Sequence, residues 1–157
     1  RAFRSAGFIA LFAHDYPAVI TQMRRALELN PSLASAQYAI ANALLMQGDA
    51  AGALVAAKAE RVPQFALTAT AIAAHRLGDT AAADAAFATL LADFGDAALY
   101  QQAQVLAQRG DKAAAIARLE TAYAKRDSGM LLAPNDPLLD PLRSEAKLGE
   151  LLSRLAS

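Results

Sequence analysis

A Gly-Asp doublet recurs along this chain at a nearly constant spacing, and this recurrence constrains the fold more than any other feature. The copies are Gly48-Asp49, Gly78-Asp79 and Gly110-Asp111, and His14-Asp15 is a fourth copy in which histidine replaces the glycine. Successive copies are 34, 30 and 32 residues apart. A period near 34 residues, with helical patterning on both sides, is typical of stacked helix-turn-helix repeats. Such repeats form a scaffold rather than a catalytic cleft.

Each doublet joins a residue that ends one helix to a residue that begins the next. Glycine readily takes the left-handed conformation that closes a helix at its C-terminus. Aspartate accepts a hydrogen bond from a free N–H in the first turn of the following helix. We therefore expect left-handed Gly48, Gly78 and Gly110, each followed by an aspartate N-cap. His14 is expected to have the same structural role, because histidine tolerates the left-handed region better than most residues.

The patterning predicts an all-α fold with four helical pairs over residues 1–126 and a separate segment over residues 127–157. Breaks at Asn30-Pro31-Ser32, Pro63 and Gly95-Asp96 separate the pairs. The expected pairs are 2–13 with 16–29, 33–47 with 50–60, 64–77 with 80–93, and 97–109 with 112–126.

The segment 127–157 is expected to close the array. Pro134, Pro137 and Pro141 prevent a long helix there, and a last helix is expected after Ser144, where leucines recur at helical spacing. A repeat array exposes an apolar face at its end, and this segment is predicted to cover that face.

Composition excludes several classes of partner. The 42 alanines favour closely packed helices. Lys+Arg and Asp+Glu both number 15 and no basic run is present, so neither nucleic acid nor an anionic membrane is an expected partner. There are no cysteines and no apolar run of about 18 residues. We expect a cytoplasmic protein, with the periplasm as the alternative, and a piece of a longer protein because the chain begins at Arg1 rather than methionine.

The chain offers little for catalysis. Its two histidines, His14 and His75, have no metal-ligand partner at helical spacing, and no phosphate loop, nucleophile elbow or zinc motif is present. Asp136 and Asp140 form a carboxylate pair, but each precedes a proline, so turn formation is the favoured interpretation. We predict no enzyme activity, no metal and no cofactor.

These residues resemble the tetratricopeptide repeat family, in which bulky, small, aromatic and proline positions recur across two helices. The matching positions are Phe3, Gly7, Ala26 and Pro31; Ala41, Gly48-Asp49 and Ala53; Leu67, Ala71, Ala83 and Phe87; and Leu99, Ala103, Ala115, Leu119 and Ala122. Gln37 and the shortened second and third repeats depart from the pattern. The resemblance implies a right-handed superhelical array of about four repeats. The segment 135–143 also looks like a closing segment common after bacterial repeats of this kind.

In this family the first helix of each pair lines a concave groove that binds protein segments. Carrying the register over gives the groove candidates Arg4, Phe8, Tyr38, Asn42, Thr68, Ile72, His75, Tyr100 and Gln104. An aromatic side chain beside an amide can hold an extended peptide by packing and hydrogen bonding. Ordinary solvated positions are the competing interpretation. A clamp for acidic chaperone tails is rejected, because Phe8, Ala39, Phe65 and Ala69 stand where four of its five polar residues would be needed.

The expected function is a non-enzymatic protein-interaction scaffold. The alternative, which the resemblance suggests, is a regulatory or sensory domain of a larger bacterial signalling enzyme or transcription regulator. A small-molecule pocket in the groove is a third hypothesis. Self-association is also expected as an option, through the first helix, over residues 2–13.

Overall fold

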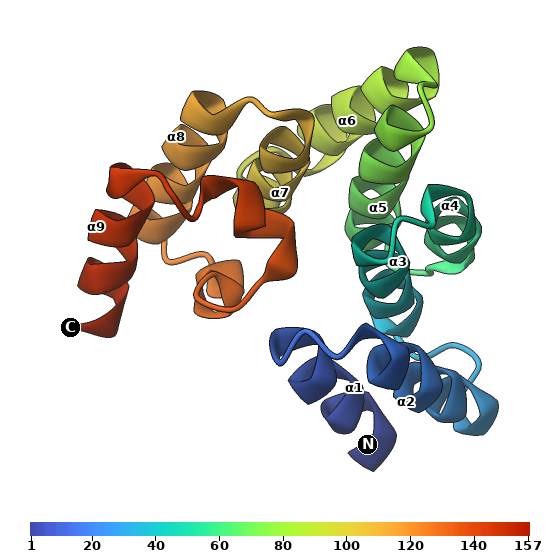
Figure 1. The fold of residues 1–157 in the computed structure, drawn as a ribbon. Coiled ribbons are helices and arrows are strands. Elements are labelled where there is room, and N and C mark those ends of the chain that lie inside the picture. Colours follow the sequence, from blue (N-terminus) through green and yellow to red (C-terminus); the bar gives the residue numbers. More distant parts are fainter.

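The computed structural model describes residues 1–157 and is all-helical, with nine α-helices, three 3-10 helices and no β-strand. The predicted all-α class is therefore confirmed. Eight α-helices form neighbouring pairs joined by short turns (Figure 1). The pairs are α1 (Ala2–Phe12) with α2 (Tyr16–Leu29), α3 (Ala36–Met46) with α4 (Ala50–Ala59), α5 (Pro63–Arg76) with α6 (Thr80–Phe94), and α7 (Leu99–Arg109) with α8 (Lys112–Ala124).

The turn inside each pair has the geometry that the doublets predict. Gly48, Gly78 and Gly110 have φ angles of 83°, 79° and 85°, and His14 takes the same region at 59°. The aspartate that follows donates its N–H to the carbonyl five residues earlier, at 2.8–3.0 Å in all four turns. These bonds satisfy carbonyls that the end of a helix leaves free.

Three of the four aspartates also cap the second helix with their side chains. Asp15, Asp49 and Asp79 accept from the N–H three residues ahead, at 3.2, 2.8 and 3.1 Å. Asp111 makes no such bond, so that part of the prediction is wrong. A fifth turn of the same type occurs at Arg126-Asp127, where Arg126 has a φ of 58° and Asp127 donates to the Ala122 carbonyl. The sequence rule missed it because arginine stands in place of glycine.

Two predicted helices begin too early. The predicted helix 33–47 begins at Ala36, because Ser35 is left-handed with a φ of 66° and cannot continue a helix. The predicted helix 97–109 begins at Leu99, because Gly95–Ala98 forms the 3-10 helix η1.

Small residues form the seam within each pair, as expected. Ala41, Ala71 and Ala103 on the first helices are fully buried, as are their counterparts Ala53, Ala83 and Ala115 on the second helices. In the first pair Gly7 has this role. A Cβ atom at Gly7 would lie 2.7 Å from the Met23 Cε, so the side chain of Met23 occupies the space that glycine leaves.

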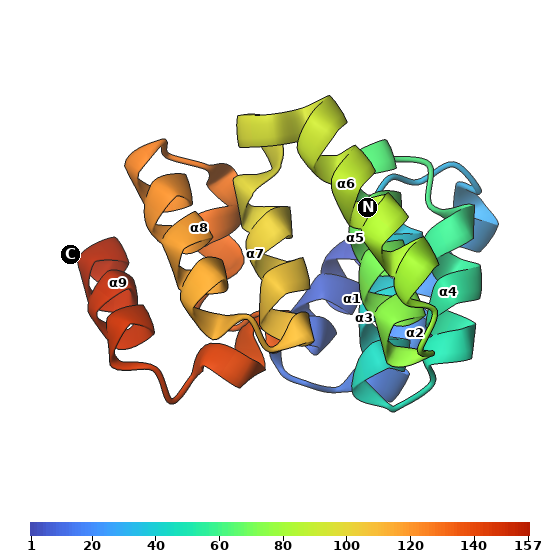
Figure 2. The same ribbon diagram turned by 90° about the horizontal axis from the view of Figure 1, so that it is seen from above.

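The buried side chains form two hydrophobic clusters. One is built mainly from α1 to α6 and the other from α7, α8 and the segment that follows them. Phe87 of α6 packs against both clusters. Figure 2 shows α7, α8 and α9 (Ala146–Ala156) side by side at one end of the molecule, with the earlier helices at the other.

The segment after Arg126 contributes buried residues to both hydrophobic clusters. The amphipathic helix α9 begins close to the predicted position and covers α8 with buried Leu148 and Leu151. Before it come the 3-10 helices η2 (Ser128–Leu132) and η3 (Pro137–Leu142). η3 turns back from the end and packs on α7, with further contacts to α3 and α8 (Figure 1). None of the helices combines the length and apolar character that crossing a bilayer requires.

Candidate functional site

A hollow of about 450 Å³ lies between helices of the first three pairs and the later helices α7 and η2. Five of the nine predicted groove residues line it. One side is formed by α1, α3 and α5, and the other by η1, α7 and η2. The predicted residues that line it are Arg4, Phe8, Tyr38, Tyr100 and Gln104. The register carried over from the sequence thus brings residues from three separate pairs to one place.

The other four predicted residues lie outside this hollow. Asn42, Thr68 and Ile72 are only 1%, 0% and 1% exposed. α3 and α5 have neighbours on several sides, and α7 packs directly on α5. Burial alone does not set these three residues apart, because Tyr38, Tyr100 and Gln104 in the lining are only 6%, 0% and 2% exposed. The Thr68 hydroxyl donates to the Gln64 carbonyl within its own helix, at 2.6 Å. His75 is exposed near the C-terminal end of α5, whereas the hollow is lined by residues at the N-terminal end of this helix.

Aromatic side chains form the α1–α5 side of the hollow. The rings of Tyr38 and Phe65 stack with centroids 5.0 Å apart. The ring centroids of Phe8 and Phe12 are 6.2 Å apart. The Arg4 guanidinium lies over the Phe8 ring at 5.6 Å and donates to the Ser35 hydroxyl at 3.0 Å. This side therefore offers a broad aromatic surface with one cation held at its edge.

The opposite side is organised around Asp136, a residue of the closing segment. The Asp136 carboxylate accepts from the Tyr100 hydroxyl and from Gln104 Nε2, both at 2.7 Å, and from the Leu138 N–H at 2.9 Å. Gln104 Oε1 in turn accepts from the Tyr38 hydroxyl at 2.8 Å, which connects α7 to α3. Asp136 therefore forms the turn that we predicted for it, and it also anchors a network that the sequence did not reveal.

Burial governs the ionisation of this network. It raises the pKa of the Asp136 carboxyl above its usual value, although the hydrogen bonds from Tyr100, Gln104 and the Leu138 N–H offset part of the shift. Burial also raises the pKa values of the Tyr38 and Tyr100 hydroxyls, and the Asp136 charge adds to both shifts. Both tyrosines therefore remain hydrogen-bond donors at neutral pH.

The closing segment is bound to this wall much as a peptide would be. Gln108 Nε2 of α7 donates to the Leu138 carbonyl at 2.8 Å, and the Leu138 side chain is fully buried. At Gly129, a Cβ atom would lie 2.5 Å from the Tyr100 ring, so η2 passes against the ring with no room for a side chain. Side chains of α7 thus bind a main-chain carbonyl and a carboxylate from a segment about 30 residues away.

Glu60 supports the other wall, and sequence reasoning missed it. Its carboxylate accepts from the N–H groups of Ser35 and Tyr38 at the start of α3, at 3.2 and 2.9 Å. It also accepts from Arg61 and Val62, just before α5, at 2.9 and 3.0 Å. One buried carboxylate therefore satisfies donors at the beginning of two helices that line the hollow. Glu60 stands between Lys58 and Arg61 in the sequence, and no local pattern marks it as buried.

Two amides that line the hollow have no partner within the chain. The side chains of Gln64 on α5 and Gln101 on α7 make no hydrogen bond, and both are partly exposed. Amide side chains in such positions are suited to bonding the N–H and carbonyl groups of an extended peptide. No group of three or more His, Asp or Glu side chains lies close enough together to hold a metal ion.

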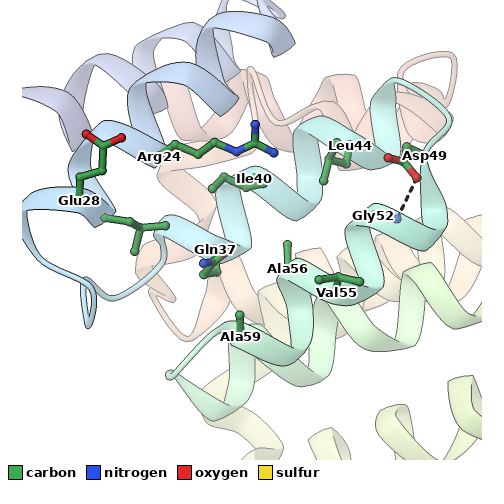
Figure 3. A pocket seen from close by; sticks show the side chains of 11 residues that line it. Arg24, Glu28, Gln37, Ile40, Leu44, Asp49, Gly52, Val55, Ala56 and Ala59 are labelled. Atoms are coloured by element: carbon green, nitrogen blue, oxygen red, sulfur yellow. Dashed lines mark hydrogen bonds between the residues drawn. The ribbon is translucent and has the colours of Figure 1, made fainter.

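A larger and shallower hollow of about 680 Å³ lies between α2, α3 and α4 (Figure 3). Ile40 and Leu44 of α3 line it, beside Arg24 of α2 and Val55 of α4. None of the predicted groove residues lies in it. Its α4 side is formed largely by glycine and alanine, and its polar lining residues are Arg24, Glu28, Gln37 and Asp49.

No protein-family model matches the chain, and no curated protein is similar to it at a significant level.

Proposed function

We propose that this chain is a non-enzymatic protein-interaction module that binds an extended segment of another protein in the hollow between α1, α3, α5, α7 and η2. In this proposal the four helical pairs form a right-handed superhelical array of the tetratricopeptide type. The repeated turn geometry and the small-residue seams support that arrangement. The α7 side of the hollow is then part of the concave wall.

One observation carries this proposal: the wall that we assign to a partner already holds a stretch of protein chain. The contacts from Tyr100, Gln104 and Gln108 to residues 136–138 are made with a carboxylate and a main-chain carbonyl. The neighbouring open part of the wall has the same kinds of groups, namely aromatic rings and free amides. It is therefore suited to the same kind of ligand.

The test is to block the hollow without disturbing its hydrogen bonds. Ala97 is an exposed residue of η1 that lines the hollow, and Ala97→Trp would fill part of it. Ala81→Trp is the matched control, because Ala81 is an exposed alanine on α6 far from the hollow lining. Peptides selected from a random display library on the native protein are titrated against both variants by fluorescence polarisation.

We expect Ala97→Trp to weaken binding at least tenfold and Ala81→Trp to leave it unchanged. Selected peptides that bind Ala97→Trp as well as the native protein would contradict the proposed site. Alanine variants of Tyr38 or Tyr100 are unsuitable for this test, because both residues are buried and their loss would unfold the wall itself.

A further inference from the structure

The Asp136 carboxylate is buried without a cation paired to it. The side chain of Arg143 is the nearest basic group in the segment, but it donates to two main-chain carbonyls, those of Ala133 at 2.9 Å and Asp136 at 2.8 Å. Its ion pair, at 3.6 Å, is with Asp140. The charge of Asp136 is therefore stabilised mainly by hydrogen-bond donors.

All the donors in this cluster point toward Asp136. Tyr38 donates to Gln104, Gln104 donates to Asp136, and Tyr100 and the Leu138 N–H donate to Asp136 as well. An ionised carboxylate accepts hydrogen bonds and donates none, so it fixes the direction of every bond in the network. The network joins α3 to α7 through two side chains that are 66 residues apart in the sequence.

We infer that Asp136 is a charge-dependent latch, which holds α3 and α7 at one spacing when ionised and lets that spacing vary when protonated. A protonated carboxyl has one O–H donor, and both of its oxygens already face donors: Tyr100 and Gln104 at Oδ2, and the Leu138 N–H at Oδ1. When the Asp136 carboxyl is protonated, at least one of the three groups that donate to it therefore loses its acceptor. If the Tyr100 hydroxyl accepts that proton, its own O–H loses the carboxylate as acceptor; if the Gln104 amide turns to accept it, Gln104 Oε1 leaves the Tyr38 hydroxyl and the present bond between α3 and α7 is lost.

Asp136 is the group of this cluster whose charge we expect to change with pH. The titratable or charged groups around it are Tyr38 from α3, Tyr100 from α7 and Arg143 from its own segment. Burial raises the pKa values of both tyrosines, so they stay protonated, and arginine stays charged. The raised pKa of Asp136 moves its own titration toward neutral pH.

The test measures the distance between the two walls as a function of pH. The chain has no cysteine, so Gln47→Cys and Ala113→Cys place spin labels uniquely at exposed positions after α3 and at the start of α8. Pulsed electron-spin distance measurements are made from pH 4 to 8, and the carboxyl carbon signal of Asp136 is followed by NMR over the same range. We expect a narrow distance distribution when Asp136 is ionised and a broader one when it is protonated, with both signals sharing one midpoint.

Two variants test whether the change in distance comes from protonation of Asp136 or from acid acting on the protein as a whole. Asp136→Asn should give the broad distribution at every pH. Tyr38→Phe, which removes only one hydroxyl, should leave Asp136 titrating while the distance no longer follows it. A distribution that stays constant while Asp136 titrates would overturn the inference, and so would a pH-dependent distribution in a folded Asp136→Asn protein. If Asp136→Asn does not fold, the Tyr38→Phe comparison decides alone.

Discussion

Leu138 and Leu139 are neighbours in the chain, yet their side chains lie in different hydrophobic clusters. Leu138 packs in the cluster of α1 to α6, and Leu139 packs in the cluster of α7 to α9; both side chains are fully buried. Because two consecutive residues bridge the clusters, η3 couples the helices of the first three pairs to the end of the molecule.

This bridge predicts different local effects for two otherwise similar substitutions. Leu138→Ala and Leu139→Ala should each lower the free energy of unfolding by about 2–5 kcal/mol in urea denaturation. In hydrogen exchange, Leu138→Ala should accelerate amides of α3 and α5, and Leu139→Ala those of α7 and α8. Leu131→Ala is the control, because Leu131 is 76% exposed and should change stability by no more than about 0.5 kcal/mol. Identical exchange patterns in the two core variants would contradict the bridge.

The pairs and their turns could be predicted from the sequence because their causes are local. A glycine that adopts positive φ and an aspartate that follows it act within a few residues, and the alanine seams follow from helical spacing. The start of α3 could not be predicted in this way. The start of α3 depends on Glu60, which lies 25 residues after Ser35 in the sequence. The helical pattern around Ser35 therefore contains no information about this contact.

The candidate site was predicted only in part, for a related reason. Helical register predicted Tyr38, Tyr100 and Gln104, and the structure places all three in the lining of the hollow, but which part of each helix borders the hollow depends on how successive pairs pack. Asn42 and Ile72 share that register and lie outside the lining of the hollow. The insertion of Asp136 beside Gln104 joins residues 32 positions apart, and no local pattern encodes such a contact.

Asp136 should make stability depend on pH with a definite sign. Its pKa is raised in the folded protein, so between about pH 3.9, the usual value of an unfolded aspartate, and the raised value the folded chain holds more protons than the unfolded chain. The free energy of unfolding therefore falls as pH rises through this window and levels off above it. Asp136→Asn should remove this fall. Urea denaturation from pH 4 to 8 gives the difference between native and variant; a difference that is constant with pH would contradict the shift.

Substitution of a turn glycine by alanine should destabilise the protein, whereas the same substitution of a helical glycine should stabilise it. Gly78 has a φ of 79° with no atom near its missing Cβ, so Gly78→Ala should cost about 1–2 kcal/mol from backbone strain alone. Gly149 lies inside α9, also with open space around it, and Gly149→Ala should stabilise the protein by about 0.5–1 kcal/mol. Thermal unfolding followed by circular dichroism measures both. A stabilising Gly78→Ala would show that this turn tolerates a different geometry.

The Glu60 carboxylate should contribute more to the free energy of unfolding than an exposed surface carboxylate does. Glu60→Ala leaves buried N–H groups of Ser35 and Tyr38 without an acceptor and should cost about 2–3 kcal/mol. Glu60→Gln keeps one acceptor oxygen and should cost less. Glu150→Ala is the control, because Glu150 is exposed on α9 and makes no ion pair. Equal losses for Glu60→Ala and Glu150→Ala in urea denaturation would refute this role.

Self-association through the first pair remains a prediction. The exposed apolar surface of α1 identifies this helix as the expected contact. Ile9 is 69% exposed on α1, whose main helix contacts are with α2 and α3. We expect a concentration-dependent dimer that buries this face, because covering an exposed isoleucine side chain is worth about 1.5–3 kcal/mol per copy. Ile9→Glu should hold the protein as a monomer in multi-angle light scattering. Val55→Glu, at a residue that is 72% exposed on α4, should leave the dimer intact. A native protein that is monomeric at the highest concentration reached, or an equal effect of the two charge substitutions, would rule out α1 as the contact.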